Sequence, residues 1–150
     1  MKESLYLDTS VPSAYYDDRD KKRLEATIKF WKEVLPSYKT YVSEITVKEL
    51  NDTKDENLRK KFKKLIKGFK VLKTKKVIKD LAESYIEKEI FSEKYIDDAR
   101  HVAMVSYYKI SYLVSWNYKH MVKVKTRKIV NSVNILKGFK EIEIVSPLEL

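Results

Sequence analysis

The chain has 150 residues, enough for one domain (1–150) with a buried core, and its 43% hydrophobic and 36% charged residues exclude a disordered chain. The absence of cysteine excludes disulfides and thiolate chemistry, and the sequence has neither a signal-peptide pattern nor an apolar run long enough to span a bilayer, so we expect a cytoplasmic protein. The net charge of +10 favours binding to polyanions such as nucleic acid, but a lysine-rich solvated surface gives the same balance.

The first predicted element is a buried strand that covers the apolar run Leu5-Tyr6-Leu7 and ends at Asp8. Pro12 then predicts a turn. Apolar residues at helical spacing predict a helix over 21–35, which Pro36 ends. A short strand follows at 38–42, and the residue after it, a serine, is a suitable N-cap for a helix that runs to about residue 50.

The same alternation of helices and strands continues to the end of the chain. A basic amphipathic helix is predicted from residue 57 to 69, with Gly68 as its stop signal. The remaining predicted strands are 69–72, 110–115 and 142–145, and the remaining predicted helices are 77–91, 97–108 and 127–136. This order predicts an α/β fold in which a mostly parallel sheet is covered by helices on both faces.

Four polar side chains stand where a strand ends or where a helix faces inward: Asp8, Glu49, Asp98 and Asn117. Because the carboxyl ends of parallel strands meet at one edge of a sheet, we expect these side chains to gather there. Carboxylates crowded together repel one another unless a cation lies among them, and such oxygen ligands suit Mg²⁺ or Mn²⁺. A metal held in this way can activate water against a phosphodiester without a protein nucleophile.

Each of these residues has another explanation when it is considered alone. Asp8 is a common type of residue at a turn, and Glu49 is a good helix former on an exposed face. Asp98 lies in the first turn of its helix, where an acid is stabilised by the helix dipole, and Asn117 can simply bend a loop. His101, one helical turn after Asp98, either contacts that residue or is packed and hydrogen-bonded in the core. The joint placement of the four is therefore the argument for a site.

The segment Tyr6-Leu7-Asp8-Thr9-Ser10 is similar to the opening strand of the PIN-domain nucleases, and in particular of VapC-type toxins. In all, four segments of the chain resemble motifs of that family, in the same order. The other three are Ser43-Glu44-Ile45-Thr46-Val47-Lys48-Glu49-Leu50, Asp98-Ala99-Arg100-His101-Val102-Ala103 and Tyr112-Leu113-Val114-Ser115-Trp116-Asn117-Tyr118-Lys119-His120. The tail, from Arg127 to Pro147, also fits one branch of the family, so that the resemblance covers essentially the whole chain.

The resemblance implies a three-layer α/β/α sandwich and an endoribonuclease that depends on Mg²⁺ or Mn²⁺, the toxin of a type II toxin–antitoxin pair. It implies that Asp8, Glu49 and Asp98 are metal ligands, that hydroxyl groups of Ser10 and Ser115 steady the site, and that the protein is a homodimer with a small antitoxin as partner. The fourth acidic position of the family is often Asp, whereas this chain has Asn117. An amide brings no charge, so we expect one tight cation and a second that binds only with substrate phosphate.

Two other classes of function remain open from the sequence. A non-catalytic RNA-binding or scaffold module with the same fold is consistent with Asn117. A receiver domain or an aspartate-nucleophile phosphatase is less well supported, because the phosphatase needs a second acid two residues after Asp8, where Ser10 stands.

Overall fold

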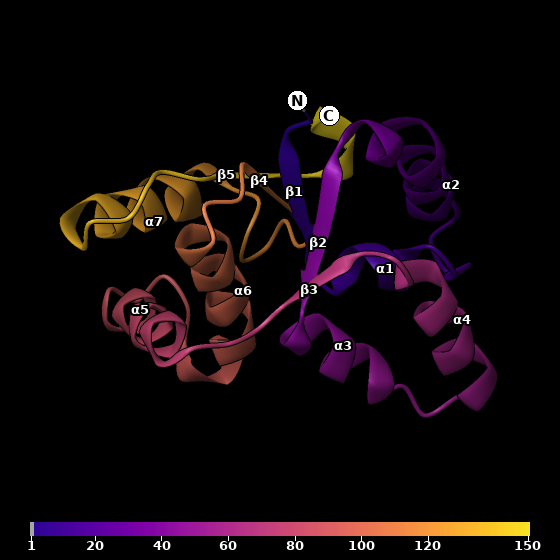
Figure 1. Ribbon diagram of the computed structural model, residues 1–150, viewed down its shortest axis with the longest axis horizontal. Coiled ribbons are helices and arrows are strands. Elements are labelled where there is room, and N and C mark those ends of the chain that lie inside the picture. Colours follow the sequence, from indigo (N-terminus) through magenta and orange to yellow (C-terminus); the bar gives the residue numbers. More distant parts are fainter. Residues whose placement is uncertain (1) are drawn as a thin grey trace.

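The computed structural model describes residues 2–150, in which five parallel strands form the central sheet (Figure 1). Their order across the sheet is β3-β2-β1-β4-β5. The strands are β1 (Ser4–Leu7), β2 (Lys39–Ser43), β3 (Lys70–Leu72), β4 (Tyr112–Val114) and β5 (Glu143–Val145). The chain moves outward from β1 to β2 and β3, then returns to place β4 on the other side of β1. Such a reversal of strand order opens a crevice at the carboxyl ends of the two central strands.

Helices cover both faces of this sheet, which confirms the predicted three-layer α/β/α architecture. In Figure 1, α5, α6 and α7 lie on one side of the sheet, and α1, α2 and α4 lie on the other. The helices are α1 (Ser10–Ala14), α2 (Lys21–Lys29), α3 (Glu44–Asn51), α4 (Glu56–Ile66), α5 (Lys76–Glu87), α6 (Ile96–Tyr107) and α7 (Val124–Leu136). Shorter helical turns span Phe30–Val34, Leu35–Ser37, Glu93–Tyr95 and Pro147–Glu149. Within residues 2–150, no helix is both long and apolar enough to cross a membrane.

The strands supply apolar side chains to two separate cores because successive residues of a strand point to opposite faces. Tyr6 and Leu113 pack with the core between the sheet and α5, α6 and α7. Their neighbours Leu5, Leu7 and Val114 pack with the core on the side of α1 and α2. Both faces of β1 and β4 are therefore buried, which explains why the sequence there is a continuous apolar run and not an alternating one.

The main local difference from the sequence prediction concerns the segment after β1. Pro12 does not mark a simple turn, because it is the third residue of the short helix α1. Backbone N–H groups in the first turn of a helix have no partner within the helix, so proline, which lacks this group, is tolerated there. The predicted helix 57–69 ends at Ile66, three residues early, and Gly68 with φ of +93° provides the predicted stop before β3. The predicted helix 21–35 continues beyond α2 as a π-helical turn, Phe30–Val34.

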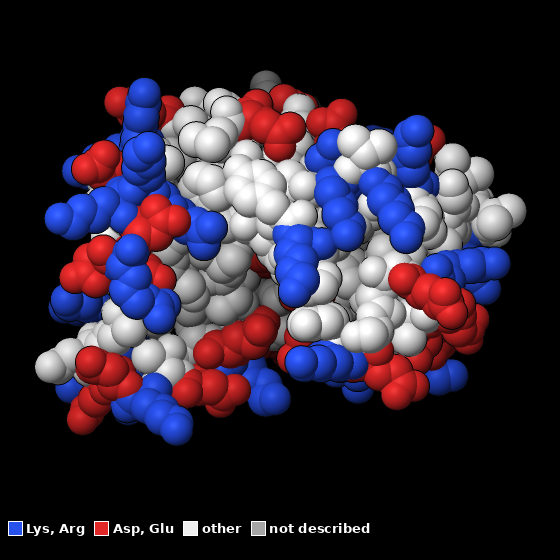
Figure 2. All heavy atoms as spheres, turned by 180° about the vertical axis from the view of Figure 1, so that it is seen from behind, with Lys and Arg blue, Asp and Glu red and all other residues white. Residues whose placement is uncertain are grey.

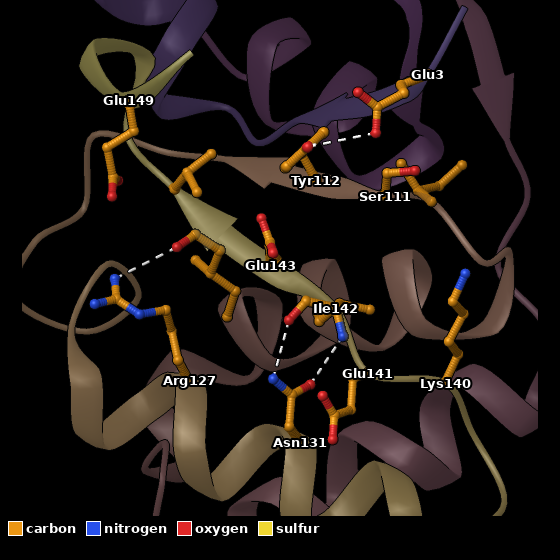
Figure 3. Close-up of a pocket in the computed structure, with 13 residues that line it drawn as sticks. Glu3, Ser111, Tyr112, Arg127, Asn131, Lys140, Glu141, Ile142, Glu143 and Glu149 are labelled. Atoms are coloured by element: carbon orange, nitrogen blue, oxygen red, sulfur yellow. Dashed lines mark hydrogen bonds between the residues drawn. The ribbon is translucent and has the colours of Figure 1, made fainter. Parts of the chain in front are cut away.

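The edge of β5 that does not pair with β4 is covered by side chains of α7 (Figure 3). The side-chain amide of Asn131 donates to the carbonyl of Ile142 over 3.0 Å, and its oxygen accepts from the backbone N–H of the same residue over 2.9 Å. Arg127 donates to the carbonyl of Ile144 over 3.5 Å. A cavity of about 580 Å³ beside these contacts is lined by none of the four predicted site residues. The cavity and the predicted site are therefore separate.

Candidate active site

The predicted site residues lie at the edge of the sheet where the adjacent strands β1 and β4 end, on the loops after these strands and on α3 and α6. Asp8 directly follows β1, and Ser115 and Asn117 follow the neighbouring strand β4. Asp98 lies in the first turn of α6, and Glu49 lies near the end of α3. Because β1 and β4 are adjacent and parallel, the residues that follow them lie at the same edge of the sheet.

Asp8 is buried and is held by two serine hydroxyl groups. Ser10 Oγ donates to Oδ1 over 2.5 Å, and Ser115 Oγ donates to Oδ2 over 2.5 Å. Burial raises the pKa of Asp8, against the opposing effects of the positive charge on His101 and of the two hydroxyls. Ser10 and Ser115 therefore make the contacts that the resemblance implies, and they fix the orientation of the carboxylate.

The loop after β4 is tied to the same hydroxyl groups and reaches Asp98. The backbone N–H of Trp116 donates to Ser10 Oγ and that of Asn117 donates to Ser115 Oγ, both over 2.9 Å. The side-chain amide of Asn117 donates to Asp98 Oδ2 over 3.5 Å. Asn117 thus connects β4 to α6 and stands beside the carboxylate that a fourth acid would face.

Glu49 is paired with the buried side chain of His101, which lies on α6. His101 Nε2 and Glu49 Oε1 are 2.7 Å apart, and Thr9 Oγ1 donates to the same oxygen over 2.8 Å. Burial raises the pKa of Glu49, but the hydrogen bond and charge of His101 and the hydroxyl of Thr9 outweigh it, so that the pKa falls below its usual value. Glu49 is therefore ionised at neutral pH and Nε2 donates to it.

The surroundings of His101 favour its protonated, positively charged form. Burial lowers its pKa, but Tyr6, the hydrogen bond to Glu49 and the negative charges of Asp8 and Glu49 raise it well above the usual value for histidine. The sequence left two possibilities for His101, a contact with Asp98 or a packed and hydrogen-bonded position. The structure supports the second, and the partners, Tyr6 and Glu49, come from distant parts of the chain. No local spacing in the sequence signals this pairing.

Asp98 experiences the negative charge of the whole cluster. Burial raises its pKa to about 6, and the charges of Asp8, Glu49 and Asp97 add to this effect while His101 opposes it. These charge interactions indicate that Asp8, Glu49 and Asp98 share one electrostatic environment. A carboxyl group with a pKa this high in a crevice is typical of a functional site.

The carboxylate oxygens of the cluster are the candidate ligands for a divalent cation. Residues 2–150 contain no group of three or more His, Cys, Asp or Glu side chains arranged to hold a metal ion. Glu49 Oε2 and Asp98 Oδ1 accept no hydrogen bond from the described residues. Both oxygens of Asp8 are occupied: Oδ1 accepts from the backbone N–H and the hydroxyl of Ser10, and Oδ2 accepts from the hydroxyl of Ser115. Free oxygens on two carboxylates fit a Mg²⁺-like ion, which keeps several waters and binds through one or two carboxylates and substrate phosphates.

The fold is a three-layer α/β/α sandwich with acids at the switch point of its sheet. Neither the protein-family models nor the curated proteins give a match to the chain. Solved structures do match it. Mycobacterium tuberculosis VapC20, a toxin that cleaves the sarcin–ricin loop, is 16% identical with a TM-score of 0.62, over 93% of this chain and 98% of that one.

Two further solved structures have the same fold. A chain of VapBC-1 from nontypeable Haemophilus influenzae is 15% identical with a TM-score of 0.60, over 96% of this chain and 98% of that one. A chain of VapBC2 from Rickettsia felis, bound to a DNA fragment from its promoter, is 10% identical with a TM-score of 0.57, and the match covers 95% of this chain and 97% of that one. These likenesses span nearly the whole chain and establish its fold.

Proposed function

We propose that the protein is a metal-dependent endoribonuclease that hydrolyses RNA phosphodiester bonds. The observation that carries this proposal is the cluster of Asp8, Glu49 and Asp98 at the switch point of the sheet. Their mutual repulsion contributes to the raised pKa of Asp98. A divalent cation, Mg²⁺ or Mn²⁺, would relieve that repulsion, so the cluster is suited to bind one.

The residues of the cluster have separable roles in this proposal. Asp98 and Glu49 hold the cation through their free oxygens, and Asp8, oriented by Ser10 and Ser115, completes the negative site. Asn117 offers an amide to Asp98 and positions the loop after β4. A bound divalent cation supplies acidified water and neutralises charge on the phosphate under attack. No side chain is required as a nucleophile.

The surface charge supports RNA as the substrate. Figure 2 shows Lys and Arg side chains on both sides of a hollow near the centre of one face. Close to Asn117, the ring of His120 lies 4.2 Å from that of Tyr95, and Lys119 and Lys123 lower the pKa of His120, after the larger effect of burial. Cations and half-buried aromatic rings beside the acids are suited to bind the phosphates and unpaired bases of a single strand.

We further propose that the protein is the toxin of a type II toxin–antitoxin pair and forms a homodimer. Two of the structures with this fold are VapBC complexes, and one contains promoter DNA. By likeness, a small antitoxin would cover the crevice of this chain. Light scattering of the purified protein tests the dimer: a mass twice that of the 17.8 kDa chain is expected, and the mass of one chain would contradict it.

Cleavage of a mixed-sequence RNA by the purified, partner-free protein tests the enzymatic proposal. Cleavage is expected with Mn²⁺ or Mg²⁺, none with EDTA, and none with the Asp98→Ala variant in any metal. Thr40→Val, a change at the second residue of β2 and so away from the carboxyl ends of the strands, is the matched control and should cleave as the wild type does. Cleavage by Asp98→Ala at the wild-type rate would contradict the proposal.

A second candidate function is an RNA-binding or scaffold module without catalysis. It is favoured by two observations: the fourth acidic position holds Asn117, and no three acids among residues 2–150 are arranged around a metal position. In this case, RNA would bind equally well with EDTA and would remain intact at every metal concentration. The two candidates are thus distinguished by the same assay.

A further inference from the structure

Glu49 is anchored by one of its two carboxylate oxygens. Thr9 Oγ1 and His101 Nε2 both bond Oε1, over 2.8 Å and 2.7 Å, and Oε2 bonds no described residue. Thr9 comes from the segment after β1 and His101 from α6, so Glu49 is held from two sides. Glu49 is only half-buried, with 34% of its side chain exposed, and the protein engages one of its oxygens, whereas it engages both oxygens of the buried Asp8.

The anchor on the His101 side is itself fixed by a chain of buried hydrogen bonds. The Tyr6 hydroxyl lies 2.5 Å from His101 Nδ1 and 2.7 Å from Ser43 Oγ. Ser43 is the N-cap of α3, where its hydroxyl accepts from the backbone N–H of Ile45 over 3.2 Å. The chain of contacts therefore begins at one end of α3 and returns near its other end, at Glu49. It fixes α3 relative to β1 and α6.

We infer that Thr9 and His101 are positioning residues, which hold Glu49 by Oε1 and thereby keep Oε2 free for a divalent cation. This inference rests on the proposed function. A glutamate side chain free to rotate would lose that freedom when it bound an ion, and a side chain already held avoids the loss. Partners that orient a ligating side chain commonly change metal affinity about 10-fold or more when they are removed.

Titration of the metal-free protein with Mn²⁺, followed by calorimetry, tests the inference without an activity assay. Thr9→Val removes the hydroxyl and preserves the shape of the side chain, and we expect it to raise the Kd for Mn²⁺ about 10-fold. Thr9→Ser restores the hydroxyl and should restore the wild-type Kd. A merely structural role of Thr9 would not give this pattern of loss and rescue. Thr40→Val, which removes a threonine hydroxyl from β2, is the control and should leave the Kd unchanged.

The His101 side is tested by Tyr6→Phe, because a direct change of a fully buried histidine risks misfolding. Tyr6→Phe removes only the hydroxyl that fixes Nδ1, and it should also raise the Kd about 10-fold. Unchanged affinity in both Thr9→Val and Tyr6→Phe, together with loss of binding in Glu49→Gln, would overturn the positioning role and leave the proposed function intact. Wild-type affinity in Glu49→Gln, or no Mn²⁺ binding by the wild type, would overturn the proposed metal site as well.

Discussion

Replacement of Asp98 by Asn should make the metal-free protein more stable at pH 8. The pKa of Asp98 rises from 3.8 to about 6 in the folded protein, chiefly through burial and through the charges of Asp8, Glu49 and Asp97. Keeping that carboxyl ionised at pH 8 costs roughly 3 kcal/mol of folding free energy if the full shift is converted. Because Asp98 is only partly buried, solvent screening reduces this to about 1–2 kcal/mol.

A second effect acts in the opposite direction but is smaller. Asp98 lies in the first turn of α6, and an acid there gains about 0.3–1 kcal/mol from the helix dipole, which an uncharged Asn loses. The net stabilisation by Asp98→Asn is therefore about 1 kcal/mol at pH 8. The folded pKa lies above the unfolded one, so the cost of the charge is fully present above pH 7 and disappears as the pH falls through 6 towards 4. The gain should disappear over the same range.

Urea unfolding of both proteins at pH 8 and at pH 4, with and without Mn²⁺, measures these effects. Mn²⁺ should stabilise the wild type, as any ligand of the folded state does, and should stabilise Asp98→Asn far less. A variant that is less stable than the wild type at pH 8 by the dipole contribution alone would contradict this expectation. It would mean that Asp98 only begins a helix and that the acids do not act on one another.

Three more changes test other parts of the structure. Asn117→Asp adds a negative charge beside Asp98, so it should lower the Kd for Mn²⁺ in calorimetry and lower the stability of the metal-free protein. An unchanged Kd would place Asn117 away from the cation. Tyr85→Phe removes the buried hydroxyl that donates to Asn134 Oδ1 and should cost about 1–3 kcal/mol in urea unfolding, with no change in Mn²⁺ affinity. Asn131→Ala uncovers the edge of the sheet at β5, and it should lower the free energy of unfolding in urea by about 1–2 kcal/mol and promote self-association of the protein. Neither effect is expected if water replaces the amide equally well.

The fold was predictable because its local signals agree with its tertiary structure. The five apolar runs became the five strands, and Pro36 and Gly68 ended helical patterns near the positions expected. The exceptions are local. Pro12 was interpreted as a turn, although proline is equally compatible with the first turn of a helix, which is where α1 places it. The helix that contains Trp31 passes through a π-helical turn, which no simple spacing of apolar residues indicates.

The candidate site was predictable only in part. Asp8, Ser115 and Asn117 follow adjacent strands, so the rule for parallel sheets brings them together. The partnership of Glu49 with His101 joins residues 52 positions apart on different helices, and it depends on how α3 and α6 pack. One weak signal was present: a histidine otherwise surrounded by apolar residues on an inward helix face needs a buried partner.

The chemical ends of the cleavage products distinguish hydrolysis by metal-activated water from attack by the ribose 2′-hydroxyl. RNA cut by the purified protein in Mn²⁺ should carry free hydroxyl and phosphomonoester ends with no 2′,3′-cyclic phosphate, because water and not the ribose 2′-hydroxyl attacks the phosphorus. The Asp98→Asn variant should yield no such products. Products that end in a 2′,3′-cyclic phosphate, formed equally in EDTA and by Asp98→Asn, would contradict the account.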